Sequence, residues 1–211
     1  ESLSNAEKAL KETQETMLQA GRVLTEKRKS CFSPFEKELQ GLLSGLGMEN
    51  ARIQLEHKTV SPNSSGLDDV ELLFSANKGG TPQALKKVAS GGEFSRLLFA
   101  IKFLMADKMA LPTLIFDEID TGISGEVALQ MVGMMKEIAS RHQVICITHL
   151  PQVAAKGDLH YFVYKDNSSD KTVSKIRLLA AEERIAELAK MIAGANPSAS
   201  AVESARELLL N

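Results

Sequence analysis

The feature that most limits how this chain can fold is a pair of short apolar stretches in its second half. They are 113–116 and 143–148, and an amphipathic, methionine-rich helix pattern covers 125–140 between them. Strands that are apolar on both faces and joined by a helix belong to parallel sheets, which helices cover on both sides. The sequence therefore predicts an α/β fold with a mostly parallel sheet flanked by helices.

Other periodic segments surround this pair. An apolar helix is expected at 93–109, before the first strand, and an antiparallel hairpin is expected from 161–164 and 173–178. Two more helices, 182–192 and 198–210, are expected to complete the chain.

Apolar residues recur every seven positions at the start of the chain. They are Leu3, Leu10, Met17 and Leu24, and the first three are each followed three places later by Ala6, Thr13 or Ala20. This narrow stripe among charged residues predicts a coiled-coil helix that needs a partner helix. An ordinary amphipathic surface helix is the alternative.

The region after the heptads predicts a second helix and then a hairpin. Pro34 separates the heptads from a helical stretch at 35–46, for which Gly47 is a suitable C-cap. From Ala51 the apolar period changes to two, and 61–66 is expected to form the turn before a strand at 70–75. We predict two domains: a coiled-coil return helix with its base at 1–47, and a lobe at 48–211.

Size, charge and cysteine content exclude several classes of protein. A chain of 211 residues with 44% hydrophobic residues can bury a core, and a net charge of −2 gives no basic field over the whole chain. Two distant cysteines, Cys31 and Cys146, predict neither a disulfide scaffold nor a zinc site, and both are expected to be reduced packing residues. Without a membrane-length apolar run or a signal peptide, we expect a cytoplasmic protein with no membrane partner.

Two adjacent acids, Asp117 and Glu118, stand where the first strand ends. Ligands of open α/β sheets bind at the carboxyl ends of the strands. One acid can bind Mg²⁺ through its oxygens, and its neighbour can polarise an attacking water. The alternative is a chance succession of apolar residues and Asp-Glu.

A Ser-Gly-Gly-Glu segment, Ser90 to Glu93, precedes the helix expected at 93–109. Its glycines permit close backbone approach, and free N–H groups at a helix start favour an anion. A plain helix cap is the alternative. Gly92 lies 25 residues before Asp117, with one helix and one loop between them, which favours a phosphate-binding role.

Two further candidates lie in the loops after the strands. His149 follows the second strand, where it is either a sensor of a terminal phosphate or a hydrogen-bonded structural histidine. In a protein that works as a pair, the loop 119–125 would lie at the subunit contact, with Asp120 reaching across it. The alternative for that loop is a turn formed by its glycines with a Ser124 cap.

These motifs, in this order, resemble the ABC-type ATPase heads of SMC-like proteins, and in detail the RecN family of DNA repair proteins. Three segments match in order and spacing: Val88 to Glu93 with Ser95 and Arg96, Phe116 to Gly125, and Ile147 to Ala155. The likeness extends to the last helices, where a closing pattern precedes residues 205–209; it consists of Arg184, Glu187, Leu188, Ala189, Met191 and Gly194. Ala89 and Glu93 replace the leucine and glutamine of general ABC heads. That departure weakens a transporter assignment and resembles RecN.

The resemblance implies a role for each matched residue. Ser90, Gly91 and Gly92, with Glu93 beside them, would contact the γ-phosphate of ATP bound to a partner head. Asp117 would position Mg²⁺, and Glu118 would be the general base for water. His149 would contact the terminal phosphate, and Asp120, reaching across the contact between the heads, would be one of the nucleotide-binding residues.

A phosphate-binding Gly-x-x-x-x-Gly-Lys-Ser/Thr motif does not occur in the sequence. The resemblance implies that an N-terminal half of the same protein carries it and that the chain is the C-terminal half of a head. A second head and DNA are the other expected partners, and the chain alone is expected to hydrolyse little or no ATP.

Two alternatives remain open at this stage: a non-catalytic dimerisation or DNA-tethering module, and a transporter nucleotide-binding domain. Heptads directly upstream argue against the transporter. A basic cluster near the glycine pair is a candidate DNA contact or simply a solvated face; it comprises Lys78, Lys86, Lys87, Arg96 and Lys102.

Overall fold

The computed structural model describes residues 2–87, 91–117, 119–123, 125–166 and 172–210. It divides into two compact units, Glu1–Phe94 and Ser95–Asn211. The predicted Ser90, Glu118 and Ser124 and the predicted turn at 167–170 lie outside the described residues.

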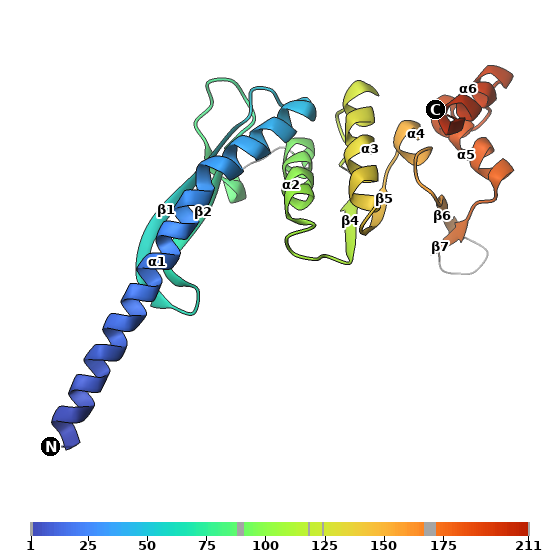
Figure 1. Ribbon diagram of the computed structural model, residues 1–211. Coiled ribbons are helices and arrows are strands. Elements are labelled where there is room, and N and C mark those ends of the chain that lie inside the picture. Colours follow the sequence, from blue (N-terminus) through green and yellow to red (C-terminus); the bar gives the residue numbers. More distant parts are fainter. Residues whose placement is uncertain (1, 88–90, 118, 124, 167–171, 211) are drawn as a thin grey trace. The chain divides into compact units, whose positions relative to one another are not determined.

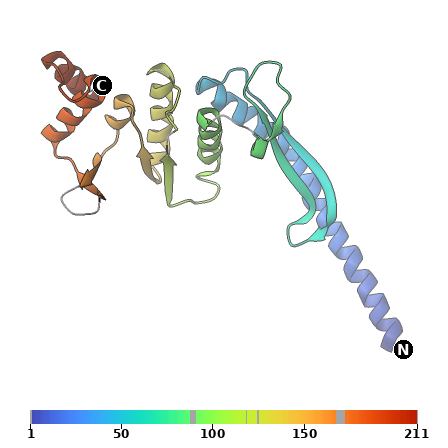
Figure 2. The same cartoon turned by 180° about the vertical axis from the view of Figure 1, so that it is seen from behind.

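The first unit consists of a long helix and an antiparallel hairpin that lies along it (Figures 1 and 2). Helix α1 covers Ser2–Gly45, strand β1 covers Arg52–Asn63 and strand β2 covers Gly66–Ser75. A two-residue strand β3, Gln83–Ala84, pairs with β2, and a 3₁₀ turn η1, Leu85–Lys87, follows. The predicted hairpin is confirmed, although β1 runs three residues into the predicted turn at 61–66 and β2 begins at Gly66 rather than Val70.

The predicted helix break at Pro34 is wrong, because α1 passes through this proline. An internal proline costs about 3 kcal/mol, since it removes one hydrogen bond and crowds the preceding turn. Beyond it, Leu39 and Leu43 are fully buried, and burying two leucines gains roughly 3–6 kcal/mol. Packing of the last turns therefore outweighs the local cost of the proline.

Gly47 ends α1 as predicted. Its φ of 75° is left-handed, and its N–H donates to Ser44 O at 3.2 Å while Met48 N–H donates to Leu43 O at 2.9 Å. These two bonds form a Schellman motif, with buried Met48 packed at its end. The predicted C-cap is thus confirmed, and the domain boundary between residues 47 and 48 stays a prediction.

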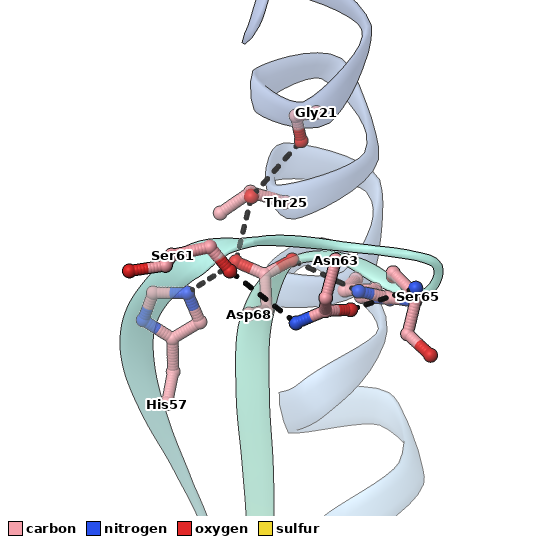
Figure 3. A network of polar contacts seen from close by, with 8 residues as sticks. Gly21, Thr25, His57, Ser61, Asn63, Ser65 and Asp68 are labelled. Atoms are coloured by element: carbon pink, nitrogen blue, oxygen red, sulfur yellow. Dashed lines mark hydrogen bonds and ion pairs between the residues drawn. The ribbon is translucent and has the colours of Figure 1, made fainter. Parts of the chain in front are cut away.

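A buried carboxylate joins the hairpin to α1 (Figure 3). Asp68, whose side chain is 1% exposed, accepts from Thr25 Oγ1 at 2.7 Å and Arg28 Nη1 at 3.1 Å, and His57 Nε2 lies 2.7 Å away. The Thr25 hydroxyl, with smaller contributions from His57 and Arg28, lowers the pKa of Asp68 to about 2 although burial opposes this. This network fixes the hairpin at one level of the helix.

The predicted heptad residues of α1 are exposed. Leu3, Leu10, Met17 and Leu24 are 73%, 60%, 45% and 37% exposed, so exposure falls towards the hairpin. An apolar stripe that stays in water is what a helix awaiting a coiled-coil partner presents.

Helix α2 covers Gly91–Met105, and the boundary between the two units falls after Phe94 in its first turn. Strands β4, Thr113–Asp117, and β5, Gln143–Ile147, are parallel and are joined through helix α3, Gly125–Ala139. The α/β class is confirmed. Parallel pairing is confined to these two strands, since the other pairings in the described residues are antiparallel.

Among the residues that the structure describes, one face of the β4–β5 pair is buried and the other is exposed. Leu114 and Phe116 are each 2% exposed, and the Phe116 ring packs edge-on against Phe99 of α2 at 4.9 Å. On the other face Ile115, Ile145 and Ile147 are 54%, 44% and 54% exposed. The prediction of helices on both faces is therefore wrong for the described residues, because nothing in them covers the isoleucine face.

The remaining elements are the short helix α4, Pro151–Ala154, the antiparallel strands β6, Tyr161–Asp166, and β7, Val173–Leu178, and the helices α5, Ala181–Ala193, and α6, Ala199–Leu210. A second core joins the last helices to α4 through Ala155, Leu188, Ala189 and Ala205. The predicted hairpin and both closing helices are confirmed, and α4 was not predicted. In the described residues no helix is long and apolar enough to cross a membrane.

Candidate functional site

The parallel register brings the predicted acid and histidine segments to one end of the β4–β5 pair. Asp117 pairs with Ile147, so both strands end at the same level and the residues after them leave the sheet together. The Asp117 side chain is exposed on the isoleucine face. A carboxylate at this end is placed to meet a ligand.

Asp120 lies inside the protein at this end and is 1% exposed. Its Oδ2 accepts hydrogen bonds from the Thr148 hydroxyl, from His149 N–H at 3.1 Å and from Leu150 N–H at 3.3 Å. Thr148 Oγ1 in turn accepts from Leu150 N–H at 3.0 Å. Asp120 therefore closes the turn that follows β5 and leads into α4.

This placement differs from the predicted reach across a contact between two heads. The three hydrogen bonds of Asp120 Oδ2 are made within the chain, and a buried acid gains more from such donors than from water. Contact with a second molecule would require the carboxylate to leave these donors.

His149 stands beside the buried acid and is itself accessible. Its side chain is 66% exposed, and its Nδ1 lies 3.4 Å from Asp120 Oδ1. With Nδ1 on the protein side, the ring leaves Nε2 as the nitrogen available to a ligand. The structure thus brings together Asp120 and His149, for which separate roles were predicted from the sequence.

Arg96 also holds the loop after β4. Its guanidinium donates to Thr121 O at 3.3 Å, and the residue is only 9% exposed. Its inclusion in an exposed basic cluster was therefore wrong. This role was not predicted from the sequence, where the signal for it was a charged residue among the apolar ones of the helix.

The other members of the basic cluster keep exposed side chains. Lys102 nevertheless has partners within the protein: its Nζ donates to Ile115 O at 3.0 Å and lies 5.4 Å from the centre of the Phe116 ring. Lys78, Lys86 and Lys87 lie in or near η1 in the first unit.

Gly91, Gly92 and Glu93 form the first turn of α2. A side chain added at Gly91 would meet no atom within 4 Å, so packing among the described residues does not demand glycine there. Free N–H groups of a helix start, with no side chain in front of them, can approach an anion closely.

Asp117 fits a Mg²⁺ site of the open kind. In the described residues no group of three or more His, Cys, Asp or Glu could hold a metal by itself. Magnesium in nucleotide sites usually takes one or two carboxylates and completes its shell with phosphate oxygens and water. An exposed acid at a strand end suits that arrangement.

The two cysteines are free thiols. Burial raises the pKa of Cys146, in β5, to about 12, and the carboxylates of Asp120 and Asp117 add to the effect. Cys146 therefore stays protonated and packs in the sheet as predicted. Cys31 is exposed, so its predicted packing role is wrong.

Several known proteins with similar sequences carry the name DNA repair protein RecN. DNA repair protein RecN of Rickettsia typhi is 43% identical over 187 residues, 88% of this chain, and that of Treponema pallidum is 38% identical over 200 residues, 92% of this chain. RecN of Vibrio cholerae is 42% identical over 83% of this chain. By sequence, this chain is a relative of RecN. No family model matches the chain.

The chain spans about one third of the length of these RecN proteins, 34% and 35% of the first two. Its fold is similar to that of solved SMC heads at low sequence identity. The Smc head domain with a coiled coil and joint from Pyrococcus yayanosii has a TM-score of 0.57 and 20% identity, over 89% of this chain and 35% of that one. A chain from a structural study of ATP-driven dimerization and DNA-stimulated activation of SMC ATPases has a TM-score of 0.51 and 20% identity, over 83% of this chain and 99% of that one.

Proposed function

We propose that this chain is the C-terminal part of a RecN-type head that binds and hydrolyses ATP with Mg²⁺ during DNA double-strand break repair and recombination. The observation that carries the proposal is the meeting of Asp117 and the Asp120–His149 pair at one end of a parallel strand pair. The relatives are DNA repair proteins, which gives no support to the transporter alternative.

Each proposed residue has a distinct task. Asp117 ligates Mg²⁺, which neutralises phosphate charge when it is bound. Glu118 accepts a proton from the attacking water, and His149 contacts the terminal phosphate through its accessible ring edge. Ser90, Gly91, Gly92 and Glu93 present the start of α2 to the γ-phosphate of ATP held by a second head.

The proposal requires two further partners for catalysis. An N-terminal half of the same protein supplies the phosphate-binding loop, and a second head supplies the opposite side of the nucleotide. Phosphoryl transfer depends mainly on positioning and charge stabilisation, so half of the site gives almost none of the rate. DNA contacts are made by the full-length protein, with the exposed lysines Lys78, Lys86 and Lys87 as candidates on this chain.

The test is steady-state ATP turnover by the full-length protein. Asp117→Asn and His149→Ala should each lower turnover on the order of 10²-fold, the usual loss when one transition-state contact is removed. Asp158→Asn is the matched control, because Asp158 is an exposed acid a few residues beyond α4. Unchanged turnover in both site variants would favour the alternative of a tethering module whose motifs only shape the fold.

A further inference from the structure

The acid in the loop after β4 is committed to the turn after β5. Oδ2 of Asp120 receives three donors from Thr148, His149 and Leu150. Two of them are consecutive backbone N–H groups just before α4, which begins at Pro151. The direction of the main chain at His149 therefore depends on a side chain 29 residues earlier.

The second oxygen of the same carboxylate faces the imidazole. Oδ1 lies 3.4 Å from His149 Nδ1 and accepts no hydrogen bond from the described residues. A carboxylate beside one ring nitrogen favours a proton on that nitrogen and restrains rotation of the ring, as in other acid–histidine pairs. One buried group thus acts on both the main chain and the ring of His149.

We propose that Asp120 is a positioning residue that holds the 148–150 turn and directs Nδ1 of His149 inward, so that Nε2 faces the terminal phosphate. The proposal rests on the proposed function for the identity of the ligand. Asp120 itself touches no nucleotide in this arrangement and acts only through His149.

A structural role confined to the turn makes a different prediction. The backbone bonds alone would make Asp120 matter for folding but not for the state of the ring. Arg96 and Gly122 also shape the loop, through the bond to Thr121 O and a left-handed φ of 73°. Two quantities therefore distinguish a positioning role from a purely structural one: which ring nitrogen of His149 carries the proton, and the energetic coupling between Asp120 and His149.

The ring is tested by ¹H–¹⁵N spectra of the 211-residue chain labelled at histidine. His149→Gln identifies the His149 signals among the four histidines. At a pH where the ring is neutral, we expect the proton mainly on Nδ1 in the wild type and mainly on Nε2 in Asp120→Asn. The same tautomer mixture in both proteins would overturn the proposal.

The coupling is tested by a double-mutant cycle on ATP turnover in the full-length protein. Loss of a group that orients a functional histidine costs about 10- to 100-fold. Asp120→Asn should therefore reduce turnover about tenfold or more in the wild-type background and less than about twofold in His149→Ala. Asp158→Asn should change neither. Equal factors in both backgrounds, or no effect in either, would overturn the proposal.

The two claims fail separately. If His149→Ala leaves turnover unchanged, the phosphate contact of the proposed function is wrong, and the spectra alone decide the positioning role. If Asp120→Asn does not fold, Thr148→Val replaces it, since this variant removes one donor and keeps the acid. Its loss of turnover should likewise appear only when His149 is present, and equal losses with and without His149 would overturn the proposal.

Discussion

Replacing Phe116 by alanine should destabilise the second unit far more than replacing its neighbour Ile115. Phe116 is 2% exposed, and its ring centre lies 4.9 Å from that of Phe99. The Lys102 ammonium lies over the same ring, 5.4 Å from its centre. Full burial of such a side chain gains about 1.5–3 kcal/mol, the aromatic pair about 0.5–1.5 and the cation–π contact about 0.5–1. Phe116→Ala should therefore cost about 3–5 kcal/mol, in the range seen for large core truncations.

Ile115→Ala is the matched control on the same strand. Because Ile115 is 54% exposed, it has little burial to lose, and the expected cost is about 1 kcal/mol or less. Equilibrium urea unfolding of the 211-residue chain measures both. Tyrosine fluorescence reports on the second unit, because the chain has no tryptophan and its two tyrosines lie in β6.

Equal losses for the two variants would refute the assignment of the faces. They would mean that both faces of β4 are buried, as the apolar sequence of the strand suggests. A loss of unfolding free energy that is at least about three times larger for Phe116→Ala than for Ile115→Ala supports the structure.

Three further outcomes are expected. Pro34→Ala should stabilise the first unit by about 2 kcal/mol, since the restored helix bond outweighs the lost stiffness of the unfolded chain, and a lower melting temperature by circular dichroism would contradict the continuous helix. Gly21→Leu should lower the melting temperature, because a Cβ at Gly21 would lie 2.5 Å from a side chain of the hairpin. Gly41→Leu is the control, because Gly41 lies in the same helix with no atom within 4 Å of an added Cβ, and its melting temperature should not fall. Equal effects of the two substitutions would argue against the close approach at Gly21. The Asp107 carboxylate raises the pKa of His142 above its usual value of 6.5, so the stability gained from protonated His142 is full below pH 6.5 and declines as the pH rises through the raised pKa. His142→Gln should abolish this decline. If the urea midpoints of the wild type and the variant change in the same way between about pH 6 and 9, the prediction is contradicted.

Sequence periodicity predicted the type of most elements because the core faces of this protein are regular. The helix pattern at 125–140 became α3 with Ala128, Met131, Met135 and other residues buried. The two apolar strands and the closing helices also lie within a few residues of their expected ends. Here local preference and tertiary packing agree.

Pro34 shows where local signals failed. Its ring predicts a break, and only the burial of Leu39 and Leu43 beyond it explains why α1 continues. The prediction for strand β4 failed for a related reason, because a strand that is apolar at each position does not reveal which of its faces packs against helices. In both cases the deciding quantity was a distant contact.

Motif spacing predicted the segments of the candidate site but not how its side chains interact. Asp117 and His149 were placed at one sheet edge from strand ends alone, and the parallel register confirms that edge. The inward direction of Asp120 and the bond from Arg96 depend on loop conformation, which a short glycine-containing sequence leaves open.

ATP turnover by full-length protein carrying Glu118→Gln tests the central claim most directly. Glutamine keeps the size of the side chain but cannot accept the proton of water, so turnover should fall by at least about 10²-fold while ATP still binds. Turnover equal to that of the wild type would contradict the account of this strand end as the site of ATP hydrolysis.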